Sequence, residues 1–324
     1  MSVEMAGSLH QSRPLPTVSV IVCCHTSERA DDVCRVVESV LGQTHPPCQT
    51  LVSVDHNEQL HQTLQGRLPD SVTLVLNTGA AGLSGSRNFA LKYVTGEVVA
   101  FIDDDAVAAE DWLYWLACHY NDNNVIGVGG RTIPVWESGR PFWFPEELDW
   151  TIGGTHKGTR ETAGPVRNLW GGNMSFRKDV FDTVGMFSLQ LGRSGSSGQG
   201  EDTEFCMRIA ATIPDATMLH EPAAVVYHKV PRQRGTLRYL ARRSFDGGLS
   251  LATLKGGRRP QAQGPASPEK TYFRYLMTTS LRERARRFYK PGSSSQVLAI
   301  GLAVAAWGTG YVSGLLTRGS SRKD

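Results

Sequence analysis

The sequence has few cysteines, and they form no recognisable zinc or disulfide pattern. Its 324 residues include six cysteines with no C-x-x-C pair, and Cys23 and Cys24 lie inside an apolar run. This argues against a structural zinc site and against a disulfide-stapled secreted domain, whereas reduced cytosolic thiols fit well. The N-terminal segment also lacks a basic stretch followed by an apolar one, so we expect residues 1–16 to form a disordered leader rather than a secretory signal.

Charge is absent from one segment of the chain and concentrated in another. Residues 291–317 carry no charged side chain, whereas residues 229–290 hold sixteen lysines and arginines against three acids. The net charge of +3 therefore divides into +13 in that basic segment and −10 in the rest, which predicts an acidic body with a basic appendage that meets an anionic surface. The uncharged stretch 296–316 is long enough to insert in a membrane, and a C-terminal helix packed on the domain is the alternative.

Apolar runs alternate with helical patterns from residue 18 onward. Strands are expected at 18–24, 50–55, 72–76, 97–102 and 125–130, with helices at 33–41, 84–94 and 110–120. This alternation predicts an α/β fold with a Rossmann-like, mainly parallel central sheet flanked by helices. We expect that domain to cover residues 17–255, followed by a linker at 256–270 and a basic, then apolar, helical extension at 271–324.

Three consecutive carboxylates, Asp103, Asp104 and Asp105, follow the predicted strand 97–102. Ligands of parallel α/β sheets bind beyond the carboxyl ends of the strands, which is where this triplet lies. On an extended exit from a strand, Asp103 and Asp105 face the same way and can share one cation. Hard oxygen ligands favour Mg²⁺ or Mn²⁺, and the alternative is a solvated turn before the next helix.

Seven segments occur in the order seen in family 2 glycosyltransferases of the GT-A fold. They are VSVIVCCHTSER, SVDH, NTGAAGLSGSRNFAL, FIDDD, WGGNMSFRKDVFDTVGMF, GEDTEFCMRI and VVYHKV. The chain resembles this family over about residues 17–250. The resemblance implies transfer of a sugar, with inversion, from a nucleotide diphosphate sugar to an acceptor hydroxyl, as in polysaccharide biosynthesis.

The resemblance also assigns the metal. It implies that Asp103 and Asp105 bind the Mn²⁺ or Mg²⁺ ion that bridges the two phosphates of the donor, with Asp104 nearer the ribose. A histidine at the place of His228, at the end of the apolar strand in VVYHKV, can be the third protein ligand in this family. A structural histidine is the alternative there.

Four further residues are implied at the donor. Asp55 resembles the acid that contacts the nucleotide base, although a strand-terminating Asp is the alternative. Asn77 and Arg87 resemble the N-x-G and RN positions of the family, although Arg87 also suits a helix-surface cation. The family usually has Pro-Thr where this chain has Cys23 and Cys24, so a backbone contact at Cys24 is retained and a threonine hydroxyl contact is lost.

The general base is expected in GEDTEF, which follows the Gly/Ser-rich segment 192–199. An acid presented after such a lid-like loop suits removal of a proton from an acceptor hydroxyl. Family position favours Asp202 as the base with Glu201 in support, while acids at a helix N-terminus are the alternative interpretation. The aromatic residues Trp136, Trp143, Trp150 and Trp170, with GTHKGTR (154–160), are candidates for the acceptor wall, although tryptophan is as often core.

Two other functions remain open at this point. A sugar-phosphate nucleotidyltransferase should carry a Gly-rich, Arg/Lys-bearing loop after the first strand, which CCHTSERADD lacks. A non-catalytic carbohydrate- or lipid-phosphate-binding protein is disfavoured by the intact carboxylates. The basic segment points to a polyprenyl-phosphate-linked or other cell-surface glycan acceptor and to an anionic membrane surface at the inner face of the cell membrane, while a soluble acceptor is also compatible with the sequence. We expect no nucleic-acid partner.

Overall fold

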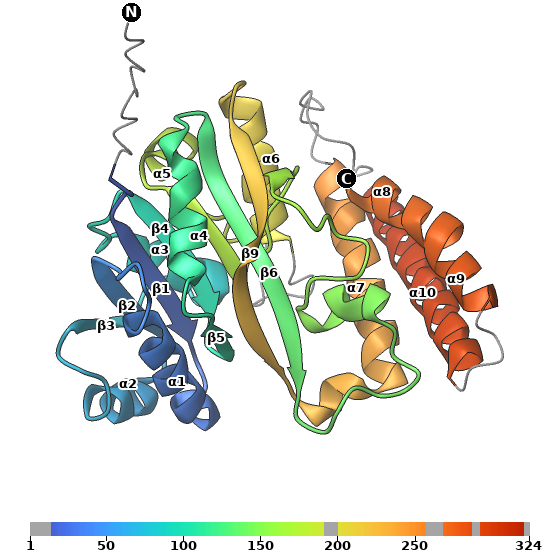
Figure 1. The fold of residues 1–324 in the computed structure, drawn as a ribbon, viewed down its shortest axis with the longest axis horizontal. Coiled ribbons are helices and arrows are strands. Elements are labelled where there is room, and N and C mark those ends of the chain that lie inside the picture. Colours follow the sequence, from blue (N-terminus) through green and yellow to red (C-terminus); the bar gives the residue numbers. More distant parts are fainter. Residues whose placement is uncertain (1–13, 191–199, 257–267, 287–291, 321–324) are drawn as a thin grey trace, which may run out of the picture.

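The fold is described from a computed structural model that covers residues 14–190, 200–256, 268–286 and 292–320 (Figure 1). Most of the predicted leader (1–16), the lid-like segment 192–199 and most of the predicted linker (256–270) lie outside the described residues. The expected α/β architecture is confirmed, because strands and helices alternate along the first part of the chain.

A parallel half-sheet forms the N-terminal part of the molecule. Its strands are β1 (Val18–Cys24), β2 (Gln49–Asp55), β3 (Val72–Asn77) and β4 (Val98–Asp103). They lie in the order β3-β2-β1-β4, and every neighbouring pair is parallel. The runs of β1, β2 and β4 are buried on both faces, which is why they read as continuous hydrophobic stretches in the sequence, whereas the middle of the edge strand β3 is half-buried. Their carboxyl ends therefore meet along one edge of the sheet.

Helices cover both faces of this half-sheet. One face carries α1 (Ala30–Leu41), α2 (Glu58–Gln65) and α4 (Trp112–Ala117), and the other carries α3 (Leu83–Leu91), α5 (Asp179–Val184) and α6 (Glu201–Thr212). The apolar stripe of α1 at Val33, Val36, Val37 and Val40 is buried against the first face, as its helical spacing predicts. Asn57 caps α2 by accepting the N–H of Leu60 at 2.9 Å.

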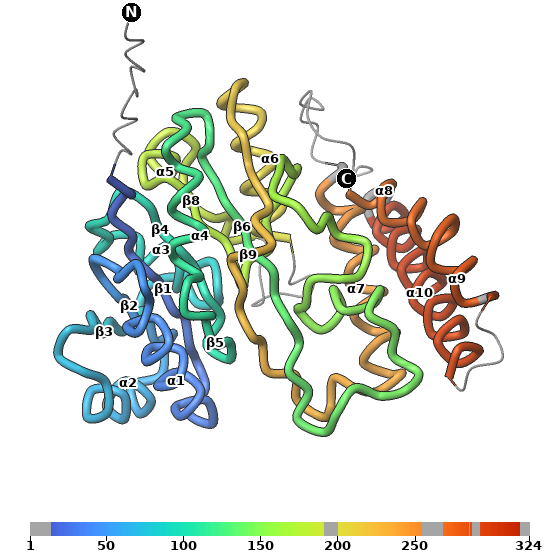
Figure 2. The backbone as a smooth tube through the Cα atoms, viewed as in Figure 1, coloured from blue at the N-terminus to red at the C-terminus, as the bar shows by residue number. Residues whose placement is uncertain are grey.

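The second half makes the sheet mixed rather than mainly parallel. Its strands are β5 (Ala106–Ala108), β6 (Val125–Trp136), β7 (Gly164–Pro165), β8 (Asn173–Arg177) and β9 (Thr217–Val230). β8 lies antiparallel to both β4 and β6, and the two long strands β6 and β9 run parallel to each other. The tube in Figure 2 shows β6 and β9 crossing the middle of the molecule. β5 pairs with β9, which brings the residues after β4 beside the end of β9.

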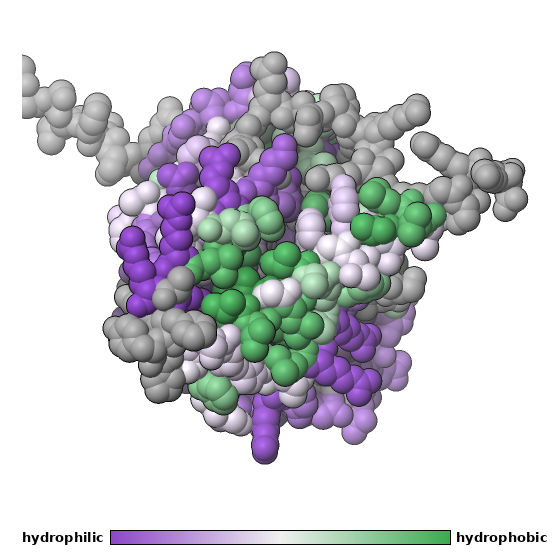
Figure 3. Space-filling view, turned by 90° about the vertical axis from the view of Figure 1, so that its right-hand side faces the viewer, coloured by the Kyte–Doolittle hydropathy of each residue, from purple (hydrophilic) through white to green (hydrophobic). Residues whose placement is uncertain are grey.

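The C-terminal helices lie on the far side of β6 and β9 from α1 and α2 (Figure 1). They are α7 (Leu237–Gly256), α8 (Pro268–Tyr275), a π-helical turn (Leu276–Ser280), α9 (Leu281–Arg286) and α10 (Ser293–Ser320). A third core cluster, which includes Phe144, Leu240, Leu276 and Ile300, joins them to the body. Figure 3 looks at this side of the molecule and shows an apolar surface bordered by polar residues.

Candidate active site

Two stretches of chain bring the predicted metal ligands together. Asp103 ends β4, Asp105 follows it two residues later, and His228 lies on β9 opposite Ala106 of β5. One ligand atom from each of Asp103, Asp105 and His228 lies within 4.8 Å of the others. The antiparallel pairing of β5 with β9 therefore creates the three-residue cluster that the motifs predicted, although His228 is far from the two aspartates in the sequence.

The chemistry of this cluster fits a divalent cation. Two carboxylates and an imidazole are ligands that suit Mn²⁺. Oδ2 of Asp104 and Nδ1 of His228 are both buried without a hydrogen-bond partner, so the polar groups here are not fully satisfied within the protein itself. Asp103, Asp105 and His228 are the residues that could hold such an ion.

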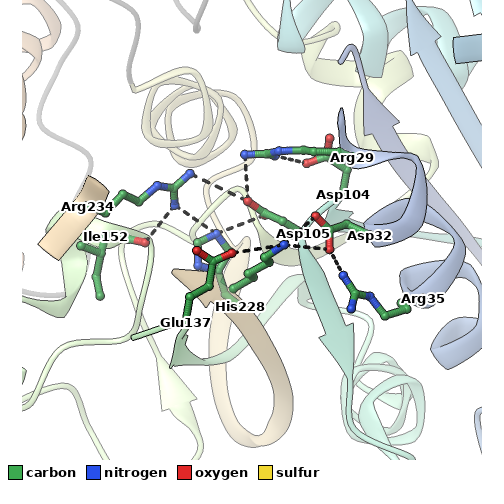
Figure 4. Close-up of polar contacts among 10 residues, drawn as sticks. Arg29, Asp32, Arg35, Asp104, Asp105, Glu137, Ile152, His228 and Arg234 are labelled. Carbon is green, nitrogen blue, oxygen red and sulfur yellow. Dashed lines mark hydrogen bonds and ion pairs between the residues drawn. The ribbon is translucent and has the colours of Figure 1, made fainter. Parts of the chain in front are cut away.

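Two arginines, which the motifs did not single out, enter the cluster (Figure 4). Arg29, just after β1, contacts Asp104 and places its Nη2 3.0 Å from Oδ2 of Asp105. Arg234, just after β9, has Nη2 3.8 Å from the same carboxylate oxygen and Nη1 3.4 Å from Nε2 of His228. Arg29 was foreseeable, because it follows a strand whose carboxyl end lies at the same sheet edge.

Burial and the neighbouring cations act in opposite directions on the pKa values of Asp104 and Asp105. Burial would raise the pKa of Asp105, but the hydrogen bond with His228 and the guanidinium of Arg29 hold it well below its usual range. Burial raises the pKa of Asp104 to about 7, against the opposing effect of Arg29. The solvated-turn interpretation of the triplet is wrong, because Asp104 and Asp105 are buried.

The predicted base, Asp202, lies in the first turn of α6. Its Oδ2 accepts the backbone N–H of Gly171 at 2.9 Å, and its Oδ1 accepts the N–H of Thr203 at 2.6 Å. Burial, followed by the negative charge of Glu201, raises the pKa of Asp202 to about 6. A carboxyl group tuned in this way suits proton transfer near neutral pH, and its bond to Thr203 means that it also helps to begin the helix.

Arg87 and Glu201 form a buried support beside this base. Nη1 of Arg87 lies 3.2 Å from Oε1 of Glu201, and its Nη2 donates to the carbonyl of Gly171 at 2.8 Å. The guanidinium also lies 5.6 Å from the ring centre of Phe101. Arg87 is thus no helix-surface cation, and its contacts fix the loop that holds Asp202.

The two glycines of WGGN connect the base with the metal cluster. A Cβ atom at Gly172 would lie 2.5 Å from Oδ2 of Asp103, so only glycine lets the chain pass so close to this carboxylate. Gly171, the preceding residue, donates its N–H to Asp202. Asp103 and Asp202 therefore lie on either side of one two-residue segment.

The remaining predicted donor residues lie at the ends of β1, β2 and β3. Asp55 accepts the side-chain amide of Asn77 at 2.7 Å and the N–H of Gly82 at 2.8 Å. Asn77 is completely buried and also contacts the loop that follows it, so it holds Asp55 in position. The side chain of Cys24 is in the core, where burial raises the pKa of its thiol, which leaves only its backbone for a ligand.

A cavity of about 300 Å³ lies beside Asp103 and Asp202. Its wall includes Trp150 and Trp170, two of the four tryptophans proposed for the acceptor, and Gly154 of GTHKGTR. Trp136 and Trp143 instead pack against the third core cluster. The wall also includes Trp307 of α10, which sequence reasoning missed because nothing local shows which face of that helix meets the body.

Comparison with known proteins identifies related sequences. The profile of the family described as Glycosyl transferase family 2 matches residues 19–185. A glucosyl-dolichyl phosphate glucuronosyltransferase of Haloferax volcanii is 36% identical over 307 residues, which cover 93% of this chain and 96% of that protein. The succinoglycan biosynthesis protein ExoM of Rhizobium meliloti is 30% identical over 198 residues, or 60% of each chain.

Solved structures share the fold. The mannosyltransferase PcManGT of Pyrobaculum calidifontis, in complex with GDP-Man and Mn²⁺, aligns with a TM-score of 0.59 at 19% identity and covers 97% of this chain and 89% of its own. GalNAc-T7 with UDP, GalNAc and Mn²⁺ aligns with a TM-score of 0.52 at 16% identity and covers 84% of this chain and 58% of its own. The expected GT-A architecture is thereby confirmed.

Proposed function

The chain belongs to glycosyl transferase family 2 and is a glycosyltransferase, and we propose that it transfers a sugar from a nucleotide diphosphate to a hydroxyl of a lipid-phosphate-linked glycan, with inversion at the anomeric carbon. One observation carries the proposal. Gly171 donates its N–H to Asp202 while its neighbour Gly172 lies against Asp103, so the base and one carboxylate of the proposed metal cluster line the same cavity.

The donor would lie at the carboxyl ends of the parallel strands. The carboxylate of Asp55 would contact the nucleobase of the donor, and Asp104 would lie nearer its ribose. The backbone at Cys24 would complete the nucleotide site. When held by Asp103, Asp105 and His228, a divalent cation would supply Lewis-acid stabilisation to the departing diphosphate. Arg29 and Arg234 add positive charge at the same place, which favours binding of an anionic leaving group.

The acceptor would enter the cavity from the side of the tryptophans. Asp202 takes the proton of the acceptor hydroxyl as its oxygen attacks the anomeric carbon on the face opposite the diphosphate. The new glycosidic C–O bond forms as the bond between the anomeric carbon and the phosphate oxygen breaks, and its electron pair leaves with the diphosphate. This is a single displacement, so the enzyme needs no covalent nucleophile.

A lipid-linked acceptor is supported by the Haloferax volcanii relative, whose name specifies a glucosyl-dolichyl phosphate and a glucuronosyl transfer. That relative matches 93% of this chain. We propose that the reaction takes place at the cytoplasmic face of the membrane, where a nucleotide sugar and a lipid phosphate could meet.

The test is a transfer assay with purified full-length protein. UDP-glucuronate, UDP-glucose, GDP-mannose and dTDP-glucose are each offered with Mn²⁺ or with a chelator, and polyprenyl phosphate glucose is the acceptor. We expect transfer from one donor only with Mn²⁺, and a product whose anomeric configuration, determined by NMR, is opposite to that of the donor. Retained configuration, or nucleotide release with no glycan product from any donor, would contradict the proposal.

Substitution of the base separates chemistry from binding. Asp202→Asn keeps the shape of the side chain but cannot accept the proton, so turnover should fall by about 10²–10⁴. Donor affinity, measured by calorimetry, should barely change. Asp182→Asn, on the exposed surface of α5, is the matched control and should behave as the wild type.

A further inference from the structure

Helix α10 is attached to the body along one stripe. Its buried residues repeat at helical spacing and include Ala299, Ile300, Ala303 and Gly310. A Cβ atom at Gly310 would lie 2.0 Å from the carbonyl oxygen of Phe245 in α7. The glycine thus brings the two helix backbones into direct contact, so α10 is held firmly against α7 rather than standing away from the domain.

The opposite side of α10 is apolar and uncovered. Leu298 is 74% exposed and Leu316 is 70% exposed, at the two ends of the helix. Leu302, Val304, Val312 and Leu315 lie between them, and Phe273 of α8 and Met277 of the π-helical turn are about half exposed. Figure 3 shows these helices from outside, with an apolar patch at the centre of the view. We call this surface the α10 face.

The same helical layer carries exposed positive charge. Six basic side chains on α7, α8 and α9 are exposed: Arg238, Arg242, Lys270, Arg274, Arg282 and Arg286. Two acids on these helices are already paired, Glu269 with Arg167 and Glu283 with Lys157. An uncharged apolar surface with basic neighbours complements an anionic lipid bilayer, in which acyl chains lie beneath negative head groups.

We propose that the α10 face docks on an anionic bilayer with α10 lying in the plane of the interface rather than crossing the membrane. Of the described helices, α10 alone has a segment, Ser293–Thr317, long and apolar enough to span a bilayer. Crossing would require the helix to leave α7, and 28% of its most apolar window is buried against the protein. Lying in the plane keeps that stripe in place and buries only the exposed side.

Docking on the membrane would also bring the enzyme to a lipid-linked acceptor, and this part of the inference rests on the proposed function. Trp307 belongs to α10 and also lines the cavity that contains Asp202. A single helix therefore contacts both the bilayer and the reaction cavity. An acceptor whose lipid remains in the membrane could present its sugar hydroxyl to Asp202 without leaving the bilayer.

Vesicle co-sedimentation of the full-length protein tests the docking without any substrate. Vesicles of phosphatidylcholine alone are compared with vesicles in which roughly a third of the lipid is phosphatidylglycerol, at low and high salt. We expect binding to the anionic vesicles, weakened by salt. Leu298→Glu/Leu316→Glu should reduce the partition coefficient at least about tenfold, because it places two charges in the apolar part of the interface. Leu41→Glu, on α1, is the matched control and should bind as the wild type.

Alkaline carbonate extraction then separates the two orientations. A helix in the interface plane should be released from the vesicles, whereas a spanning helix should resist extraction. Equal binding of the double variant and the wild type, recovery of the wild type in the supernatant with both lipids, or resistance to carbonate would overturn the proposal. Transfer to a short-chain, water-soluble acceptor without vesicles reports on catalysis separately, and we expect the double variant to retain it.

Discussion

The guanidinium of Arg29 lies 3.0 Å from the carboxylate of Asp105, among the oxygen atoms suited to a divalent cation. A metal ion and Arg29 therefore compete for the same negative charge. We predict that Arg29→Ala raises the affinity of the free protein for Mn²⁺ roughly tenfold, since charge-assisted contacts contribute on the order of 1–3 kcal/mol. Titration of Mn²⁺ followed by its electron paramagnetic resonance signal gives the affinity directly.

The same variant should bind nucleotide diphosphate less well, because a cation beside the leaving group is lost. Arg67→Ala removes an exposed arginine that pairs with Asp31 at the surface, and it should leave both affinities unchanged. If Arg29→Ala bound Mn²⁺ no better than the wild type, the arginine would not compete with the ion.

Asp105 and His228 should contribute unequally to metal-dependent donor binding. Asp105→Ala removes a buried carboxylate and leaves Arg29 and Arg234 in place, so the cluster becomes repulsive to a cation and binding should be lost. His228→Ala removes one imidazole ligand but leaves both carboxylates of the cluster, so it should weaken binding less. Calorimetry of the donor with and without Mn²⁺ measures both, with the exposed Asp70→Ala as control. Metal-independent binding of normal strength in Asp105→Ala would exclude the cluster as the metal site.

Turnover should depend on pH through Asp202. Burial and the neighbouring charge of Glu201 raise the pKa of Asp202 to about 6, and only the deprotonated form can accept a proton. Catalytic efficiency should therefore rise with pH through about 6 and reach a plateau above it. Glu201→Gln removes the negative neighbour, which lowers the pKa of Asp202 and should move the midpoint of the profile to lower pH. A midpoint that moved upward, or not at all, would contradict this coupling.

The parallel half of the sheet could be predicted because each of its strands and helices has a recognisable pattern within a short stretch of sequence. The apolar runs that form β1 to β4 are continuous, and the helix between β1 and β2 has a regular stripe ending at Gly42. The rule that parallel strands share one carboxyl edge places Asp55 and Asp103 on the same side. His228 required a resemblance to a family, since only the pairing of β5 with β9 brings it to Asp105.

The rest of the site depends on contacts that have no local signature. Arg234 comes to the cluster because β9 ends there, and Trp307 reaches the cavity because α10 packs on α7. The antiparallel strands that make the sheet mixed likewise follow from long-range pairing, which period and composition do not encode. The sequence of segment 296–316 shows that it is uncharged and apolar, but its length and composition do not show which face of the resulting helix packs on the protein.

The attachment of the C-terminal helices should depend on one buried ion pair. Glu147 is completely buried, and it is held by Arg284 of α9 and by the hydroxyl of Ser280 at 2.8 Å. Arg284→Ala would leave the carboxylate buried without its counter-ion, which typically costs about 3–5 kcal/mol. Glu147→Gln combined with Arg284→Met removes both charges and should be much less destabilising. Thermal unfolding of the two variants measures the difference.

Weaker attachment of the C-terminal helices should affect binding of the acceptor before binding of the donor. Helices α8 and α10 supply part of the cavity wall and lie outside the parallel strands that we assign to the donor. In Arg284→Ala we therefore expect a raised KM for the lipid-linked acceptor and near-normal donor affinity. Arg286→Ala, exposed on the same helix, should not change the stability, and Asp182→Asn, exposed on α5, should leave the KM for the acceptor unchanged. Equal stability of Arg284→Ala and the wild type would show that the ion pair does not hold these helices, and a parallel loss of donor binding would show that they support the whole domain.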